Sequence, residues 1–386
     1  MRVLFLTHSY PRWPGDAAGS FLLRLASALA PCGVQVAIVA PAGPGLPLRE
    51  TIGGIAVTRY RYAPATWERL AYTGTMVEEV RDTWSGRLAL LGLLAAGTAC
   101  ALRLQREYDA DLLHAHWWFP GGIMASAVSA VSSIPYMVTS HGSDVRLVTR
   151  IAAAQPFFRG VMRQAAAVTV VSRWLAQQVL HTDPRLAVRV EPMPVATELF
   201  AVHDDRPRTK RILFVGRLNE QKGLGRLFDA MAHMTETPTV DVVGDGPESA
   251  ALRSHAAALG LADRVRWHGM RPQHELPDFY RRATLLAVPS SEEGLGLAAI
   301  EAQLCGTPVV AFDSGGIADT MNAGETGILV PARDTRRFAQ ALDSLVSSPD
   351  VARRMGAAGI SWATERFAPE AVAARYAAIY RDALAT

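Results

Sequence analysis

Two apolar segments, far apart in the chain, begin with arginine and share nearly the same order of residue types. They are residues 2–7 (RVLFLT) and residues 211–216 (RILFVG). Each is followed by a polar loop that contains glycine and then by a helical pattern. Continuous apolar runs of this length are typical of strands that are buried on both faces of a parallel sheet. We therefore expect two similar domains, each of which starts with its own strand, loop and helix.

The other apolar runs continue this alternation of strand and helix. Strands are predicted at residues 34–40, 110–114, 136–140, 167–171, 239–243, 265–268, 285–289 and 308–312. Helices are predicted at residues 21–30, 225–234, 248–259 and 297–305. Such alternation implies parallel sheets with right-handed crossovers, so the predicted fold class is α/β with two Rossmann-like doubly wound domains. Ligands bind outside the carboxyl ends of such strands, and we expect the two domains to face each other across a ligand-binding cleft.

A polar, charged segment that contains proline separates the two halves near residues 200–210, as linkers commonly do. The predicted domains are residues 1–200, which would bind the acceptor, and residues 206–365, which would bind the donor. Residues 366–386 form a tail with apolar residues at helical spacing. With 386 residues, of which 49% are apolar and 19% charged, the chain can form two cores and is not a disordered one.

Charge and cysteine content exclude some classes of function and indicate the cellular compartment. Lys plus Arg is 39 and Asp plus Glu is 36, and a net charge of +3 is too small for the basic stripe of a dedicated nucleic-acid binder. Cys32, Cys100 and Cys305 show no CxxC spacing, so neither a disulfide framework nor a zinc site is expected. The first apolar run ends at Thr7, too early for a signal peptide. We expect a cytoplasmic protein.

The longest apolar stretch, residues 88–102, is too short to span a bilayer. The favoured interpretation is a buried helix that packs on a sheet. The alternative is a helix at the inner face of the membrane, where Arg81, Arg87, Arg103 and Arg106 would meet anionic lipid headgroups.

The most informative motif is residues 289–301 (PSSEEGLGLAAIE), where a predicted strand ends and a helix begins near Leu297. Gly294 and Gly296 let backbone amides approach an anion, and the helix N-terminus adds partial positive charge. Glu293 would then lie beside a sugar attached to the phosphate, and Glu301 could accept hydrogen bonds from a ribose. The alternative is that Glu293 caps the helix and Glu301 is a solvated helix residue.

A second motif, residues 216–223 (GRLNEQKG), follows the first strand of the second half. Arg217 and Lys222 would hold a diphosphate, the first as a planar fork and the second as a point charge. The alternative is two solvated loop cations. Gly244 belongs to a GDGP turn at another strand end, which lacks the third glycine of a dinucleotide-binding loop.

In the first half, the candidates again follow predicted strands. Gly19 could offer its amide to a phosphate, and His116 and the pair His141 and Asp144 lie where sugar hydroxyls would bind. His141 is as well explained by a structural role. Aromatic residues interleaved with arginines at 59–87, among them Trp67 and Tyr72, could stack on an acceptor. The favoured alternative for that segment is a loop and helix packed on the sheet.

These motifs together resemble the family-4 retaining glycosyltransferases of GT-B fold, over essentially the whole chain. The resemblance is carried by Glu293 and Glu301 at their spacing, by the GRLNEQKG and VGDG turns, and by His141-Gly142. It also rests on Gly306-Thr307-Pro308 with Gly315-Gly316, and on the tail from Trp362 to Tyr380. The first loop departs from the Gly-Gly pair common in the family, because Ala17-Ala18 precede Gly19-Ser20. Residues 195–198 (VATE) also differ from the usual Gly-Val-Asp.

The resemblance implies a role for each matching position. Arg217 and Lys222 would hold the donor diphosphate together with Gly19, Gly244, Gly296 and Leu297. Glu293 and His141 would act at the donor sugar, and Glu301 at the ribose. Backbone near Met270 and Arg271 would read the base. The tail helix would cross back onto the first domain.

The expected reaction is transfer of a hexose-type sugar, with retention, from a nucleotide diphosphate sugar to a hydroxyl of a saccharide, lipid-linked or small-molecule acceptor. The family needs no metal or other cofactor. Asp109 and Asp111 have DxD spacing but begin a predicted strand, so no metal ligation is expected there. Two alternatives are a non-hydrolysing nucleotide-sugar epimerase of the same fold, and a non-catalytic sugar-binding protein.

Overall fold

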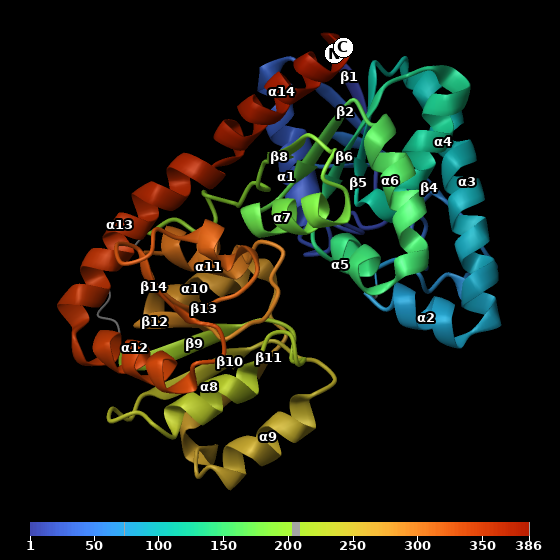
Figure 1. The fold of residues 1–386 in the computed structure, drawn as a ribbon. Coiled ribbons are helices and arrows are strands. Elements are labelled where there is room, and N and C mark those ends of the chain that lie inside the picture. Colours follow the sequence, from blue (N-terminus) through green and yellow to red (C-terminus); the bar gives the residue numbers. More distant parts are fainter. Residues whose placement is uncertain (73, 203–208, 386) are drawn as a thin grey trace. The chain divides into compact units, whose positions relative to one another are not determined.

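The computed structural model describes residues 1–72, 74–202 and 209–385, and forms two compact units (Figure 1). The first unit consists of Met1–Pro194 and Pro369–Thr386, and the second of Val195–Ala368. The second unit starts earlier than residue 206 because the Val195 amide donates to the Phe367 carbonyl at 3.0 Å. Phe200 also packs edge-on against Tyr280. Residues 203–208 of the predicted linker lie outside the described part of the chain.

The first unit is built on an eight-stranded sheet of order β3-β4-β2-β1-β5-β6-β7-β8. The strands are β1 (Arg2–Leu6), β2 (Gln35–Pro41), β3 (Arg49–Ile52), β4 (Ile55–Tyr60), β5 (Leu112–His116), β6 (Tyr136–Ser140), β7 (Ala167–Val170) and β8 (Val188–Val190). All neighbours are parallel except β3 and β4, which pair antiparallel. β3, β4 and β8 were not predicted. β3 and β8 are edge strands with mixed, mostly exposed sequences, and in the largely buried β4 Thr58 and Arg59 interrupt the apolar run, whereas the predicted strands are continuous apolar runs.

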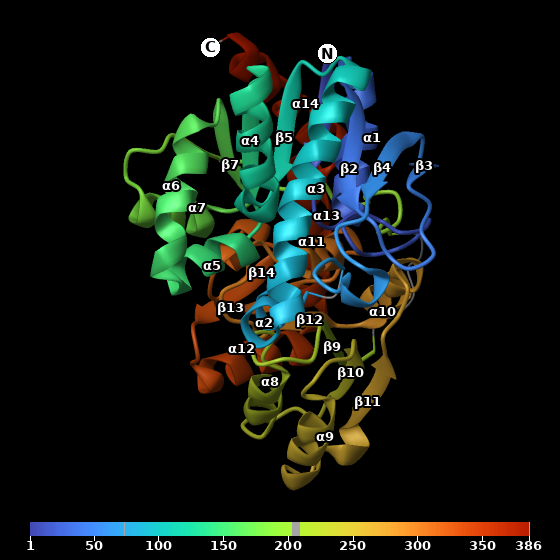
Figure 2. The same cartoon turned by 90° about the vertical axis from the view of Figure 1, so that its right-hand side faces the viewer.

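Helices cover both faces of this sheet, as a doubly wound fold requires. They are α1 (Ser20–Leu29), α2 (Met76–Asp82), α3 (Trp84–Tyr108), α4 (Ile123–Ser132), α5 (Ser143–Arg150), α6 (Gln155–Gln164), α7 (Arg173–Thr182) and α14 (Pro369–Ala385). α3 packs beside α4 and runs along the sheet (Figure 2), while α14 packs against α1. Val372, Tyr376 and Tyr380 of α14 are fully buried in the first unit. The C-terminal helix thus returns to the first domain, as the resemblance implied.

The second unit has an entirely parallel sheet of six strands in the order β11-β10-β9-β12-β13-β14. The strands are β9 (Arg211–Val215), β10 (Thr239–Val243), β11 (Val265–Gly269), β12 (Leu285–Val288), β13 (Val309–Asp313) and β14 (Gly327–Pro331). The helices are α8 (Leu224–Met231), α9 (Ser249–Ala258), α10 (Leu276–Arg282), α11 (Leu297–Leu304), α12 (Thr335–Ser347) and α13 (Pro349–Phe367). Apolar side chains of sheet and helices, such as Phe228, Phe312 and Phe338, form one core. The predicted α/β class with two doubly wound domains is confirmed.

Each sheet reverses its strand order beside the strand that carries the repeated arginine-led motif. In the first unit the reversal lies between β1 and β5, and in the second between β9 and β12. Loops that leave the carboxyl ends of neighbouring strands on either side of a reversal diverge and leave room for a ligand. The loops after β1, β5 and β6, and those after β9 and β12, are therefore the places to look for a site.

Helix α3 is longer than the apolar stretch that marked it in the sequence. It has 25 residues, and with a mean hydropathy of 1.6 over an 18-residue window it is, by length and composition alone, long and apolar enough to cross a membrane. One side, with Ala89, Leu93 and Ala101, packs into the first unit, but Leu88 and Leu91 on the opposite side are exposed. The predicted packing on the sheet is found, but the helix is buried along one stripe only, because a helix on the surface of a sheet leaves its other side in solvent.

Candidate active site

The loop after β9 is a tight turn that prepares the start of α8. The Lys222 amide donates to the Asn219 side chain and carbonyl, both at 3.1 Å. Gly223 precedes α8 with a φ of 69°, and a Cβ there would collide with the Pro289 carbonyl, so the turn requires glycine. Gly244, after β10, has a φ of 137° and packs directly on the Gly216 carbonyl. The two glycine turns thus bring the loops of neighbouring strands into contact.

The loop after β12 holds Glu293 from two sides. Its backbone pairs with Gly315 in a parallel bridge, and the Gly316 amide donates to its carbonyl at 2.7 Å. Gly315 has a φ of 68°, and a Cβ there would collide with the backbone of Glu293. Gly296, with a φ of 99°, then starts α11 at Leu297. The first amides of α11 have no acceptor within the helix and, with the helix dipole, form a site for an anion.

Lys222 and Glu293 come from these two loops and form an ion pair. Nζ of Lys222 lies 2.6 Å from Oε1 of Glu293, and Glu293 is nearly buried while Lys222 is partly exposed. Arg217 is exposed and, within the described part of the chain, has no ion-pair partner. The sequence pattern predicted separate contacts, Lys222 with the diphosphate and Glu293 with the sugar. The structure places them side by side at the strand reversal of the second unit, with a further cation in the same loop.

Glu301 is buried on α11, so the alternative of a solvated helix residue is wrong. Its carboxylate accepts hydrogen bonds from the Tyr280 hydroxyl at 2.9 Å and the Gln273 amide at 3.4 Å. Burial, reinforced by Glu301, raises the pKa of Tyr280 well above its usual value, so this phenol stays a hydrogen-bond donor. The carboxylate is thus held in place by Tyr280, a contact that nothing in the sequence pattern suggested.

The segment predicted to read the base follows β11. Met270 is 80% exposed, and Arg271 is an exposed residue whose Nε donates to the His268 carbonyl at 3.0 Å. An exposed thioether can cover a planar ring, so contact with the base stays a prediction for this segment.

Histidines gather where β1, β5 and β6 end in the first unit. Nδ1 of His116 lies 3.2 Å from Nε2 of His141, and the ring of Trp117 lies between His8 and His141 with centroid distances of 4.4 Å to each. Burial lowers the pKa of His8 to about 4. Burial, followed by the neighbouring His8, lowers that of His141 to about 3. These imidazoles are therefore neutral near pH 7, and in the part of the chain that the structure describes no metal-binding cluster occurs.

Asp144, predicted to contact the acceptor, is buried and engaged by the backbone. Its carboxylate accepts hydrogen bonds from the amides of Trp118 at 2.9 Å, His141 at 3.1 Å and Gly142 at 3.0 Å. Burial raises the pKa of Asp144, although these hydrogen bonds act in the opposite direction. We revise its role to an anchor of the loop that carries His141, because the amides occupy its oxygens.

The other predicted acceptor contacts also engage in contacts within the first unit. His116 is fully buried behind His141. Trp67 packs edge-on against Trp84 with a centroid distance of 5.0 Å. The Tyr72 hydroxyl donates to the Pro41 carbonyl and accepts from Arg59, both at 2.7 Å. The favoured alternative for residues 59–87, a loop and helix packed on the sheet, therefore describes these side chains better than a stacking surface does.

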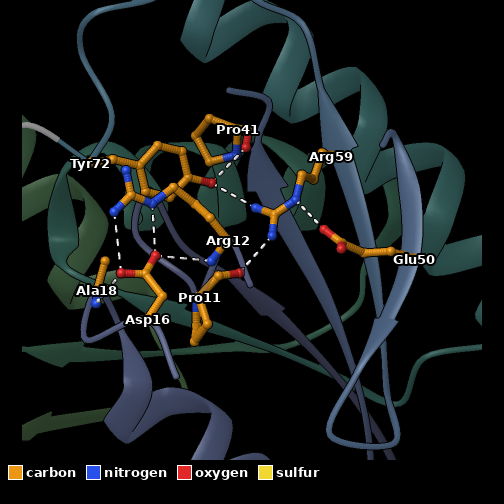
Figure 3. A network of polar contacts seen from close by, with 8 residues as sticks. All are labelled: Pro11, Arg12, Asp16, Ala18, Pro41, Glu50, Arg59 and Tyr72. Carbon is orange, nitrogen blue, oxygen red and sulfur yellow. Dashed lines mark hydrogen bonds and ion pairs between the residues drawn. The ribbon is translucent and has the colours of Figure 1, made fainter. Parts of the chain in front are cut away.

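Gly19 starts α1 with a φ of 66°, and a Cβ there would collide with the Ser9 carbonyl. A polar network shapes the loop before it (Figure 3). Asp16 binds the Arg12 side chain at 2.7 Å and the amides of Arg12 and Ala18. Buried Arg59 donates to the Pro11 carbonyl at 2.6 Å. Sequence reasoning missed this network because its centre, Arg59, lies in β4, which was not predicted.

A second network that the sequence did not reveal connects α14 to the histidines. Nδ1 of His114 lies 2.8 Å from the Tyr380 hydroxyl, and Nε2 lies 2.7 Å from Oγ1 of Thr139. The His114 ring packs against that of His116, with a centroid distance of 4.0 Å and an angle of 38° between the rings. The only signal in the sequence was a histidine on a buried strand and tyrosines at helical spacing in the tail. Neither feature shows which residue the histidine or the tyrosines contact.

Comparison with known proteins agrees with this geometry. Residues 18–199 match the model of Glycosyltransferase Family 4, and residues 195–362 that of Glycosyl transferases group 1. The chain is 31% identical to a D-inositol 3-phosphate glycosyltransferase of Frankia alni over 90% of this chain and 92% of that protein. Its fold is similar to a sucrose-phosphate synthase of Thermosynechococcus elongatus (TM-score 0.80, 24% identity, 100% and 99% coverage). It is also similar to Anabaena HepE in complex with UDP-glucose (TM-score 0.74, 20% identity, 99% coverage of both chains).

The two doubly wound units and the similarity to solved structures show the GT-B fold, and the two family models and the Frankia relative define the class as glycosyltransferases. The chain belongs to the family-4 glycosyltransferases. It is therefore a sugar transferase, and this excludes the non-catalytic sugar-binding protein that the sequence left open.

Proposed function

We propose that the protein transfers a hexose-type sugar, with retention of configuration, from a nucleoside diphosphate sugar to a hydroxyl of a saccharide, lipid-linked or small-molecule acceptor. The observation that carries this proposal is the Lys222–Glu293 ion pair at 2.6 Å beside Arg217 and the start of α11. Cations and helix amides suit a diphosphate, and a carboxylate suits sugar hydroxyls. A role in the synthesis of glycans or polysaccharides follows from the same reaction.

The relatives favour particular substrates to try first. HepE binds UDP-glucose, and the Frankia relative acts on an inositol phosphate by its name. We therefore place UDP-sugars first among donors, with GDP-sugars second, and polyols and their phosphates among the acceptors. Met270 and Arg271 would face the base, and Glu301 would accept from the ribose hydroxyls.

In the transfer, the bond between the anomeric carbon and the diphosphate oxygen breaks, and a bond to the acceptor oxygen forms. The nucleoside diphosphate leaves, and the acceptor hydroxyl proton leaves with it or passes to solvent. Arg217, Lys222 and the amides at Gly296 and Leu297 would stabilise the charge that develops on the diphosphate, a form of electrostatic preorganisation. Attack on the face from which the leaving group departs would retain the configuration.

A thermal-shift screen of nucleotide sugars tests the donor site. A specific donor should raise Tm by mass action, and about 100-fold saturation corresponds to about 2.7 kcal/mol of stabilisation. Lys222→Met should lose most of this shift, measured against its own unliganded Tm, which we expect to be lower than that of the parent because the buried Glu293 carboxylate loses its cation. If no UDP- or GDP-sugar raises Tm and none is consumed with an acceptor, the proposal is wrong. Rearranged nucleotide sugar formed from donor alone would instead indicate the epimerase.

We also propose that the reaction requires no metal or other cofactor. The charge on the diphosphate would be met by Arg217, Lys222 and helix amides, which can take the place of a divalent cation. Asp111 of the DxD pair lies at the amino end of β5, where it accepts from the Arg2 amide at 2.7 Å. Turnover should persist in EDTA at the rate of the untreated enzyme. Full loss that Mn²⁺ restores would contradict this.

Finally, we propose a cytoplasmic enzyme that contacts the membrane peripherally through α3. Trp84, Leu88 and Leu91 are exposed on this helix, and Arg81 and Arg87 flank them near its start. Apolar side chains can enter the headgroup region while arginines meet anionic lipids. At low salt the protein should cosediment with anionic but not with neutral vesicles, and Leu88→Asp/Leu91→Asp should reduce this binding. Equal recovery of the parent protein in the supernatant with both vesicle types would refute the contact.

A further inference from the structure

The hydrogen bond between His116 and His141 links two neutral imidazoles, so its direction decides where each ring carries its proton. Nδ1 of His116 and Nε2 of His141 are 3.2 Å apart. Burial is the main cause that lowers the pKa of both rings, to about 3 for His141 and well below the usual value for His116. A neutral imidazole has one donor nitrogen and one acceptor nitrogen. One ring must therefore donate to the other.

The second nitrogen of His116 indicates the direction. Nε2 of His116 is buried and has no hydrogen-bond partner among the residues that the structure describes. A proton on this nitrogen would be a buried donor without an acceptor, which is rarer in proteins than an unused acceptor. The His116 proton therefore belongs on Nδ1, from which it is donated to Nε2 of His141. His141 must then carry its own proton on Nδ1.

The surroundings of His116 keep its ring in this orientation. The ring lies between His114, at a centroid distance of 4.0 Å, and His141, at 5.4 Å, with Phe5 edge-on at 4.7 Å. His114 is itself held by Tyr380 of α14 and by Thr139. A ring packed on three sides within a fully buried site has little freedom to flip and reverse the hydrogen bond.

We propose that His116 is a positioning residue that holds His141 in its Nδ1–H tautomer, so that His141 serves as a hydrogen-bond donor to a substrate oxygen. Nδ1 of His141 has no hydrogen-bond partner in the described ranges, and the side chain is only partly buried. Nε2 is occupied by His116 and does not act as a base. The proposal rests on the proposed function, in which His141 acts at the donor sugar.

The tautomer can be measured without any turnover. In protein labelled with ¹⁵N-histidine, two-bond ¹H–¹⁵N couplings distinguish protonated from unprotonated ring nitrogens, and the His141 signals are assigned by their absence in His141→Asn. We expect a protonated Nδ1 and an unprotonated Nε2 in the parent protein. In His116→Leu, which lacks the donor, we expect the Nε2–H form of His141 to appear. A protonated Nε2 on His141 of the parent protein would overturn the proposal, whatever the activity.

Kinetics of matched variants test the donor role. An Asn amide nitrogen lies near the place of Nδ1, and a Gln amide nitrogen near that of Nε2. We expect His141→Asn to keep kcat within about tenfold of the parent and His141→Gln to lose about 100-fold, the usual effect of removing one donor. His116→Asn should keep more activity than His116→Leu. Equal losses in His141→Asn and His141→Gln would overturn the donor role. If the parent protein transfers no sugar, the proposed function fails, while the tautomer result still stands.

Discussion

Glu293→Gln is expected to lower kcat by about 100-fold while the protein stays folded. The amide keeps the size of the side chain but removes the charge that pairs with Lys222 at 2.6 Å, and it replaces one acceptor oxygen by a donor. The proposed contact with the sugar hydroxyls is lost, and Lys222 is left without its carboxylate. Steady-state kinetics with saturating donor and acceptor measure the effect. The loop should keep its shape, because its bonds to Gly315 and Gly316 involve backbone atoms.

A matched control is Glu220→Gln in the loop after β9. Glu220 is exposed and, within the described part of the chain, makes no ion pair. It carries the same change of charge, and we expect its kcat to stay within about twofold of the parent, as for surface substitutions. The site assignment would be refuted if Glu293→Gln kept a near-normal rate, or if both variants lost the same activity.

Arg59→Met is expected to lower the free energy of unfolding by about 3–5 kcal/mol. The Arg59 guanidinium is completely buried and donates to Glu50 at 2.5 Å, to the Tyr72 hydroxyl and to the Pro11 carbonyl. Its removal leaves a largely buried carboxylate and a carbonyl without their donors (Figure 3). Urea denaturation followed by circular dichroism measures the difference. Partial recovery is expected in Arg59→Met/Glu50→Leu, in which no unpaired carboxylate remains.

Arg49→Met on neighbouring β3 provides the control. Arg49 forms an ion pair with Glu107 at 2.9 Å, but both side chains are exposed. Solvent screens such a pair, and its loss should cost less than about 1 kcal/mol. Similar losses of stability in Arg49→Met and Arg59→Met would show that burial does not distinguish the two pairs, and our account of the network would be wrong.

Much of the second unit could be predicted from local sequence. Strands buried on both faces are continuous apolar runs, and the predicted segments 239–243 and 265–268 match β10 and β11 to within one residue. Lys222 and Glu293 could be identified because each lies close in the chain to a glycine that starts a helix with a positive φ, Gly223 and Gly296 respectively. Their direct pairing could not be predicted. It depends on the strand order, which places β9 next to β12 although two strands intervene in sequence.

The acceptor side of the first unit was predicted less well. Aromatic and charged residues at 59–87 suggested a stacking surface, but Tyr72 and Trp67 make contacts inside the unit. Composition does not show whether an aromatic ring is packed inside the unit or exposed for stacking. Asp144 follows a predicted strand end, as a ligand contact would, yet its oxygens are taken by the amides of its own loop. A carboxylate at this loop position can either bind a ligand or hold the loop together, and only the tertiary structure distinguishes the two roles.

The sequence by itself determined the α/β class, the two repeated units and the loops that carry Lys222, Glu293 and His141, because strand burial and glycine turns are local properties of a chain. Only the tertiary structure decided which of these side chains touch. The distance of 2.6 Å between Lys222 and Glu293, the hydrogen bond between His116 and His141 and the contact of Tyr380 with His114 join residues far apart in sequence. Such contacts depend on strand order and on the return of the last helix, which no local pattern encodes.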